Sequence, residues 1–133
     1  MLTLFVLKSG QETADPDRAI KSWGPLPSRV VHVGSLLELK SASINTEWYA
    51  VIYDNEILEA ELQAALAVFF EVSTADVFVV FQRDDTGENP PQKAPRVFRY
   101  DVIIEDNSLM PLEPSQVSFE TILNGWVILN DPN

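Results

Sequence analysis

The sequence predicts a single α/β domain around a mixed sheet, with parallel βαβ units in its N-terminal half and an antiparallel hairpin in its C-terminal half. From residue 2 to residue 70, short apolar runs alternate with segments of helical character, a pattern typical of parallel strands joined by right-handed crossovers. Two further apolar runs follow with no helix between them, which favours an antiparallel pair. A length of 133 residues, 46% of them hydrophobic, suits one packed domain over residues 1–133.

The N-terminal elements follow from where each apolar run stops. Residues 2–7 form an apolar, β-prone run interrupted by Thr3 alone, which is typical of a strand buried on both faces, inside a sheet. A short helix is expected over residues 18–23, with Asp15 or Asp17 as its N-cap. The other elements expected in this half are a strand over residues 29–33 and a second short helix near residues 36–40.

The stretch from residue 48 to residue 70 organises the rest of the chain. It predicts a buried strand over residues 48–53, a polar turn, and an amphipathic helix. Asp54 or Asn55 is expected to cap this helix, and Glu56 to place its charge near the positive end of the helix dipole. The apolar face of the helix is expected to contain Leu58, Leu62, Ala65, Leu66 and Phe69. The turn at residues 53–56 then lies at the carboxyl end of a strand, where open α/β sheets bind ligands.

The C-terminal half predicts a hairpin with a long tip. A strand over residues 77–82 is expected to pair antiparallel with one over residues 96–104, and the Pro- and Gly-containing loop at residues 83–95 is expected to be mobile. Residues 115–123 are expected to form a helical turn or two, and residues 126–129 a last, edge strand.

Composition restricts the classes of partner. The 20 acidic and 9 basic residues give a net charge of −11 with no basic patch, so nucleic acid is not expected as a partner. The chain has no cysteine, which excludes disulfides and thiolate chemistry. No apolar run approaches the roughly 18 residues that a membrane helix needs. We therefore expect no membrane insertion, and a cytoplasmic protein as synthesised.

Several segments, taken in order, resemble one known family. Residues 48–58 (WYAVIYDNEIL) resemble the segment of family 2 glycosyltransferases that runs Trp, four apolar residues, Asp, any residue, Asp, Glu and an aliphatic residue. Residues 30–35 (VVHVGS) resemble the strand end near the family's nucleotide site, and residues 82–83 (QR), 94–99 (APRVFR) and 120–126 (ETILNGW) resemble later segments. The resemblance covers most of the chain. It implies a reduced, Rossmann-like GT-A fold, shortened by a strand and a helix before Trp48.

The resemblance also implies a degenerate metal-binding DxD motif. Aligning Trp48 and Glu56 with the family's Trp and Glu puts Tyr53 and Asn55 where two metal-coordinating aspartates belong. A phenol and an amide are poor ligands for Mg²⁺ or Mn²⁺, which prefer anionic oxygens. We therefore predict no cofactor. The alternative is that Asp54 and Glu56 rebuild a site for Mn²⁺ or Mg²⁺ with a nucleotide sugar.

Four more residues are candidates for a ligand or acceptor side of the site. His32 stands where the family has an acidic residue that contacts the nucleotide, but a lone histidine without metal-binding spacing favours a core position. By resemblance, Arg96 and Arg99 lie near an acceptor site; equally, they could form surface ion pairs with acidic residues of segment 101–106. Glu120 matches a position near the end of the family's fold and receives no role.

The aromatic residues divide into two predicted groups. Trp23 and Trp126 each lie beside a glycine and are expected at surface contacts. The others have strand or helix spacing and are expected in the core: Trp48, Phe69, Phe70, Phe78, Phe81 and Phe98.

These observations predict a catalytically inactive glycosyltransferase-like domain. We expect it to act as a structural or binding module in a protein assembly, for which a virus particle is one setting, with a protein partner or a second copy docked on an exposed sheet edge. The alternative function is an active glycosyltransferase that uses a nucleotide sugar and the rebuilt site at Asp54 and Glu56.

Overall fold

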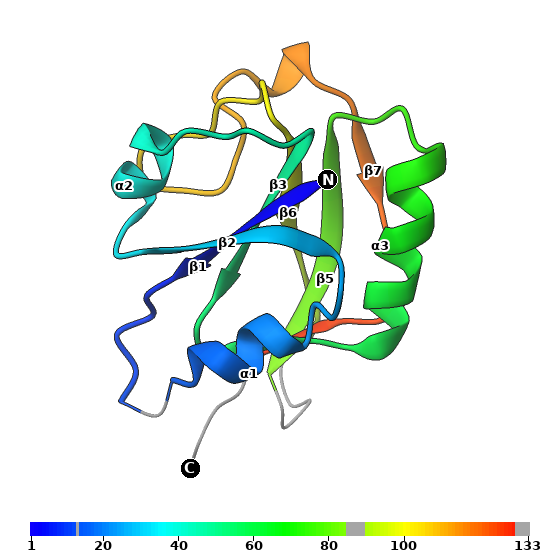
Figure 1. Cartoon of the computed structure of the whole chain (residues 1–133). Helices are drawn as coiled ribbons and strands as arrows, with labels where there is room; N and C mark the ends of the chain where they lie inside the picture. Colours follow the sequence, from blue (N-terminus) through cyan, green and yellow to red (C-terminus); the bar gives the residue numbers. More distant parts are fainter. Residues whose placement is uncertain (13, 85–89, 130–133) are drawn as a thin grey trace.

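Three parallel strands form one half of the sheet (Figure 1). In the computed structural model, which describes residues 1–12, 14–84 and 90–129, β1 (Leu2–Leu7) lies between β2 (Pro27–Val33) and β3 (Trp48–Tyr53) and pairs parallel with both. α1 (Pro16–Lys21) and α2 (Leu36–Ser41) make the two crossovers. The predicted parallel βαβ units and the internal position of the first strand are confirmed.

The second half of the sheet is the predicted antiparallel hairpin. β5 (Val77–Asp84) pairs antiparallel with β6 (Gln92–Arg99), and β6 also pairs antiparallel with β3. The second strand thus begins and ends earlier than the predicted 96–104, since the chain turns away after Arg99. Of the loop that was expected to be mobile, residues 83–84 belong to β5 and residues 92–95 to β6, and residues 85–89 lie outside the described residues.

The C-terminal residues add short strands to β5. η1 (Pro114–Gln116) is a single 3-10 turn, and β7 (Phe119–Thr121) then pairs parallel with the first residues of β5. β8 (Val127–Leu129) pairs parallel with the last residues of β5 and antiparallel with β4 (Glu56–Leu58). The described strands follow the order β2-β1-β3-β6-β5-β8-β4, with β7 beside β5. The prediction of β8 as an edge strand is wrong because β4 covers it.

The helix after β3 begins later than the sequence predicts. α3 covers Ala60–Val72, its N-cap is Glu59, and no side chain caps its first turn. Neither Asp54 nor Asn55 is a helix cap, and Glu56 is not a first-turn charge, because residues 56–58 form β4. The local sequence favours a helix, but pairing with β8, far along the chain, overrides this preference.

Both faces of the sheet are covered, which explains why β1 and β3 consist almost entirely of buried residues. α1 and α3 pack on one face, over a cluster that includes Trp23, Trp48, Leu62 and Phe78. α2 and the segment after β6 pack on the other, over a cluster that includes Phe5, Tyr49, Phe98 and Ile104. Trp23 is only 1% exposed, so its prediction as a surface contact is wrong. Among the described residues, no helix has the length and apolar composition needed to cross a membrane.

Candidate functional site

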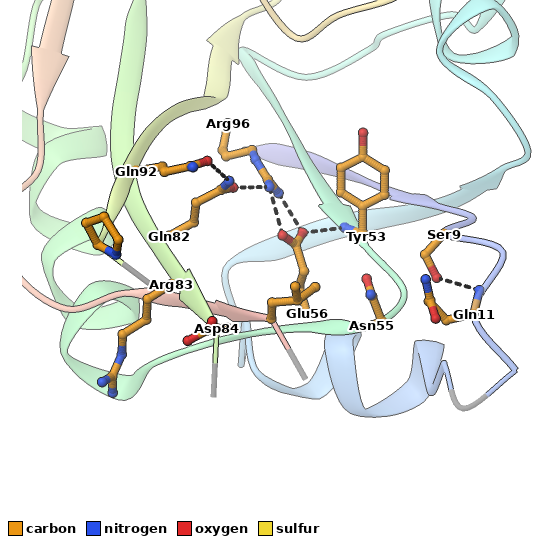
Figure 2. A pocket seen from close by; sticks show the side chains of 12 residues that line it. Ser9, Gln11, Tyr53, Asn55, Glu56, Gln82, Arg83, Asp84, Gln92 and Arg96 are labelled. Carbon is orange, nitrogen blue, oxygen red and sulfur yellow. Dashed lines mark hydrogen bonds and ion pairs between the residues drawn. The ribbon is translucent and has the colours of Figure 1, made fainter. Parts of the chain in front are cut away.

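A pocket of about 610 Å³ opens at the carboxyl ends of β1, β3 and β5 (Figure 2). The turn at residues 53–56 forms part of its wall, as expected from the position of ligand sites in open α/β sheets. Most of its lining residues have polar side chains, and they are Ser9, Gln11, Tyr53, Asn55, Glu56, Gln82, Arg83, Asp84, Pro90, Gln92, Arg96 and Leu129.

A buried ion pair forms one wall of the pocket. Arg96 Nη1 lies 2.7 Å from Glu56 Oε1 and Arg96 Nη2 lies 2.8 Å from Glu56 Oε2, so the guanidinium donates a hydrogen bond to each carboxylate oxygen. The two side chains are each only 5% exposed. The backbone N–H of Tyr53 also donates to Glu56 Oε1, at 2.8 Å. The Glu56 carboxylate therefore accepts three hydrogen bonds from its own chain, two of them from a guanidinium.

A bulge in the hairpin brings Arg96 to this position. Phe78 lies opposite Val97 and Val79 lies opposite Pro95, so Arg96 is the extra residue on β6. Bulges re-aim side chains and tolerate proline, which has no N–H to give to the ladder. Arg96 thus turns across β3, where it also donates to Val51 O at 3.3 Å. The expected alternative of a surface ion pair with residues 101–106 is wrong for Arg96.

The environment of Arg96 keeps it charged. Burial by itself lowers the pKa of the guanidinium, but the charge of Glu56 and the hydrogen bonds to it outweigh burial and hold the pKa above its ordinary value. Gln82 Oε1 accepts a further bond from Arg96 Nη2 at 2.8 Å, and the guanidinium lies 5.4 Å from the centre of the Tyr53 ring. Arg96 Nε is buried without a hydrogen-bond partner in the described part of the chain.

Asp54 does not share this pocket with Glu56. Its Oδ1 accepts the backbone N–H of Ser9 at 2.9 Å, which ties the end of β3 to the loop after β1. Asp54 instead lines a separate hollow of about 370 Å³, together with His32 and Lys8. Asp54 lies in the two-residue turn between β3 and β4, whereas Glu56 is the first residue of β4, and the two carboxylates of the alternative metal site line different hollows.

Of the degenerate motif, Tyr53 and Asn55 do line the 610 Å³ pocket. Figure 2 shows the Asn55 amide between Glu56 and the Ser9–Gln11 loop, and the Arg83 side chain extending away from the ion pair. Arg83 instead lies 3.8 Å from a Glu59 oxygen and 5.4 Å from the centre of the Trp126 ring. The groups that this turn presents to the pocket are therefore the Tyr53 phenol, the Asn55 amide and the Glu56 carboxylate, whose charge Arg96 neutralises.

The other predicted site residues lie apart from the pocket. His32 is exposed on β2, so the prediction of a core histidine is wrong. Arg99 lies 3.8 Å from Asp76 and 4.2 Å from the centre of the Trp48 ring, and it donates to Ser73 O and Ala75 O, so its expected pairing with residues 101–106 is also wrong. Glu120 is exposed and accepts a hydrogen bond from the Ser73 hydroxyl.

The sequence analysis missed the pocket's amide side chains, Gln11, Gln82 and Gln92. Gln82 and Gln92 are paired positions at the end of the hairpin where its two strands are connected. The only local signal was that the apolar run of β5 stops at Phe81 with a polar residue after it. Their facing positions follow from strand register, which the local pattern does not specify.

The order of strands and the position of the pocket define the class: this is a reduced GT-A-like fold, a small mixed α/β domain with a curled sheet. The chain is similar in structure to the crystal structure of S. aureus TarS 1-349, a glycosyltransferase, with a TM-score of 0.52 and 13% identity. The match covers 99% of this chain but 59% of the TarS chain. At this identity the likeness shows the fold alone. No family model matches the sequence. No curated protein matches it.

Proposed function

We propose that this chain is a catalytically inactive glycosyltransferase-like domain that serves as a structural or binding module in a protein assembly. The observation that carries the proposal is the state of the turn at residues 53–56. By resemblance, Tyr53 and Asn55 occupy the positions of two metal-binding carboxylates, and both oxygens of Glu56 are held by Arg96.

The electrostatics of this turn support the proposal. Mg²⁺ and Mn²⁺ require anionic oxygens with lone pairs to spare. Here the Glu56 oxygens already accept three hydrogen bonds, two of them from a permanent cation. A divalent ion at Glu56 would compete with the guanidinium for the carboxylate, and displacing Arg96 would leave a buried positive charge uncompensated, which costs about 3–5 kcal/mol.

The fold also supports a role that needs no ligand. Arg96 neutralises the buried Glu56, so this carboxylate does not depend on a bound cation for its stability. A stable sheet of this kind can be retained for its surface alone. The expected partner is another protein or a second copy of the chain, in an assembly such as a virus particle.

The second candidate is an active enzyme that uses Mn²⁺ or Mg²⁺ and a nucleotide sugar at Asp54 and Glu56. One observation favours it: the pocket of about 610 Å³ is in the size range of small-molecule sites and lies at the usual edge of the sheet. A partner chain could complete its polar lining.

Thermal stability separates the two candidates. We expect the melting temperature to stay unchanged when the protein is titrated with Mn²⁺ together with uridine or guanosine diphosphate sugars. The matched controls are Asp54→Asn and Asn55→Asp. A rise of several degrees that Asp54→Asn abolishes, or release of free nucleotide from the sugar donor, would establish the enzyme instead. If only Asn55→Asp gains a Mn²⁺-dependent rise, loss of the carboxylate explains the lack of metal binding.

A further inference from the structure

We propose that the segment following β6 is a docking surface for a cationic segment of a partner protein, in which an apolar side chain is flanked by lysine or arginine. This inference rests on the proposed role as a binding module and names the surface and the kind of partner. The docking surface consists of Asp76, Tyr100, Asp101, Ile103, Met110, Leu112 and Glu113.

Large apolar side chains are exposed together on this segment. Tyr100 is 61% exposed, Ile103 62%, Leu112 56% and Met110 40%. A single exposed apolar residue is ordinary, but several on one short segment are typical of an interaction site.

The backbone fixes these side chains outward. Val102 and Ile104 are buried on either side of Ile103, and Ile104 forms an antiparallel bridge with the buried Pro111. Leu112 N–H donates to Ile103 O at 2.8 Å. The Tyr49 hydroxyl donates to Val102 O at 2.6 Å from inside the core. The surface is therefore pre-organised, and a partner would lose little affinity to the ordering of this segment.

Two hollows flank Ile103. One, of about 310 Å³, is lined by Ile103, Leu112 and Val117 among others, and by the carboxylates of Asp76, Asp101 and Glu113. The other, of about 250 Å³, is also lined by Ile103, together with Ile44, Tyr100 and Ile104 among others. Each hollow can accept one side chain of a partner, and the carboxylates stand at the rim of the larger one.

Charge selects the partner. The neighbouring cations are already engaged: Lys40 lies 2.5 Å from Asp106, and Arg99 lies 3.8 Å from Asp76. Asp101 and Glu113 are exposed. Phosphates of nucleic acid or an anionic membrane surface would be repelled by this rim, and a second copy of a chain of charge −11 would bring like charges together. A basic segment is the complementary occupant.

The docking surface is remote from the polar pocket. In Figure 1 the segment, coloured yellow to orange, lies at the opposite end of the sheet from α1, whereas the pocket opens beside the turn that precedes β4. A partner bound here therefore leaves the pocket open, so the two sites can be tested separately.

Nuclear magnetic resonance titration of the ¹⁵N-labelled full chain tests the inference. The probe is a short capped peptide of alternating lysine and leucine, compared with glutamate–leucine and lysine–serine peptides of the same length. We expect saturable shifts at residues 100–113 and Asp76 with the lysine–leucine peptide alone. Ile103→Ser should weaken binding roughly tenfold or more, and Asp101→Asn with Glu113→Gln should weaken both the binding and its salt dependence.

Two variants elsewhere are the controls. Leu123→Ser alters a side chain that is 77% exposed near β7, and Asp17→Asn removes an exposed charge on α1; neither should change the affinity. No saturable binding, or binding that Ile103→Ser leaves intact, would overturn the inference. Shifts confined to the pocket or to β2 would overturn it and leave the module proposal standing. Sugar transfer by a protein that still binds the peptide here would overturn the module proposal alone.

Discussion

Glu56 and Arg96 lie 40 positions apart in the sequence, yet they form a bidentate ion pair in which each side chain is only 5% exposed. The pair joins β4, at the sheet edge, to the bulge of β6 beside β3. The same two residues therefore line the candidate site and contribute to the stability of the fold.

Removing one member of this pair should destabilise the protein strongly. Glu56→Gln leaves the Arg96 charge buried and uncompensated, and we expect the free energy of unfolding to fall by about 3–5 kcal/mol. Urea unfolding followed by circular dichroism measures the change.

The double variant Glu56→Leu, Arg96→Met is the control for this prediction. It removes both charges and keeps apolar volume, so we expect it to lose less stability than the sum of the two single variants. Additive losses would mean that the two side chains do not interact across the pocket wall, contrary to their geometry.

A second prediction concerns Gly125, before β8. Its φ is +80°, and a Cβ there would lie 2.6 Å from the backbone nitrogen of Leu62 in the first turn of α3. Gly125→Ala should therefore cost about 2–4 kcal/mol, through backbone strain and the forced separation of the loop from α3.

Gly10 provides a matched comparison. Its φ is +82°, but a Cβ would meet nothing within 4 Å. Gly10→Ala should cost only the backbone term, about 1 kcal/mol. Equal losses for the two variants in chemical denaturation would show that the contact with Leu62 contributes nothing.

The elements that the sequence predicted well are those with local signals. β1 and β3 are apolar runs with polar residues after them, and Asp15 does cap α1, accepting the N–H of Arg18 at 3.1 Å. The short strands β4 and β7 had no such signal. Residues 56–58 are helix-compatible in composition, and only pairing with a strand far along the chain makes them extended.

The sequence predicted where the candidate site lies, but it did not predict that the Glu56 carboxylate is paired with Arg96. The order of motifs located Tyr53, Asn55 and Glu56 at a strand end, and all three line the pocket. That Glu56 is neutralised by Arg96 depends on a bulge, and a bulge depends on strand register rather than on residue type. For the same reason Arg96 was expected, as one of two alternatives, on the surface.

A third prediction concerns Arg99, which the resemblance put near an acceptor site. Its guanidinium lies 4.2 Å from the centre of the Trp48 ring, and it donates to Ala75 O at 3.0 Å and Ser73 O at 3.2 Å. A lysine cannot make these contacts at once, so Arg99→Lys should lower stability by about 1–2 kcal/mol. Thermal unfolding checks this, with the exposed Arg18→Lys as the control, which should have no effect.

The fourth prediction is a loss of stability at alkaline pH caused by Tyr49. This tyrosine is 2% exposed, and its hydroxyl donates to Val102 O at 2.6 Å. Burial, and secondarily the charge of Asp101, raises the pKa of the phenol above its ordinary value of 10.0.

The direction of the effect follows from proton linkage. Below pH 10 the Tyr49 phenol is protonated in both the folded and the unfolded chain, and its contribution to stability is constant. Above pH 10 the unfolded chain loses this proton before the folded chain does, so the free energy of unfolding should fall as the pH rises toward the higher folded pKa.

The variant Tyr49→Phe tests this effect because its side chain cannot ionise. It should be less stable than the parent protein near neutral pH, because Val102 O loses its donor, and the difference between the two should shrink as the pH rises above 10. Urea unfolding of both proteins across this pH range measures the difference, and a constant difference would mean that Tyr49 titrates equally in the folded and unfolded chain.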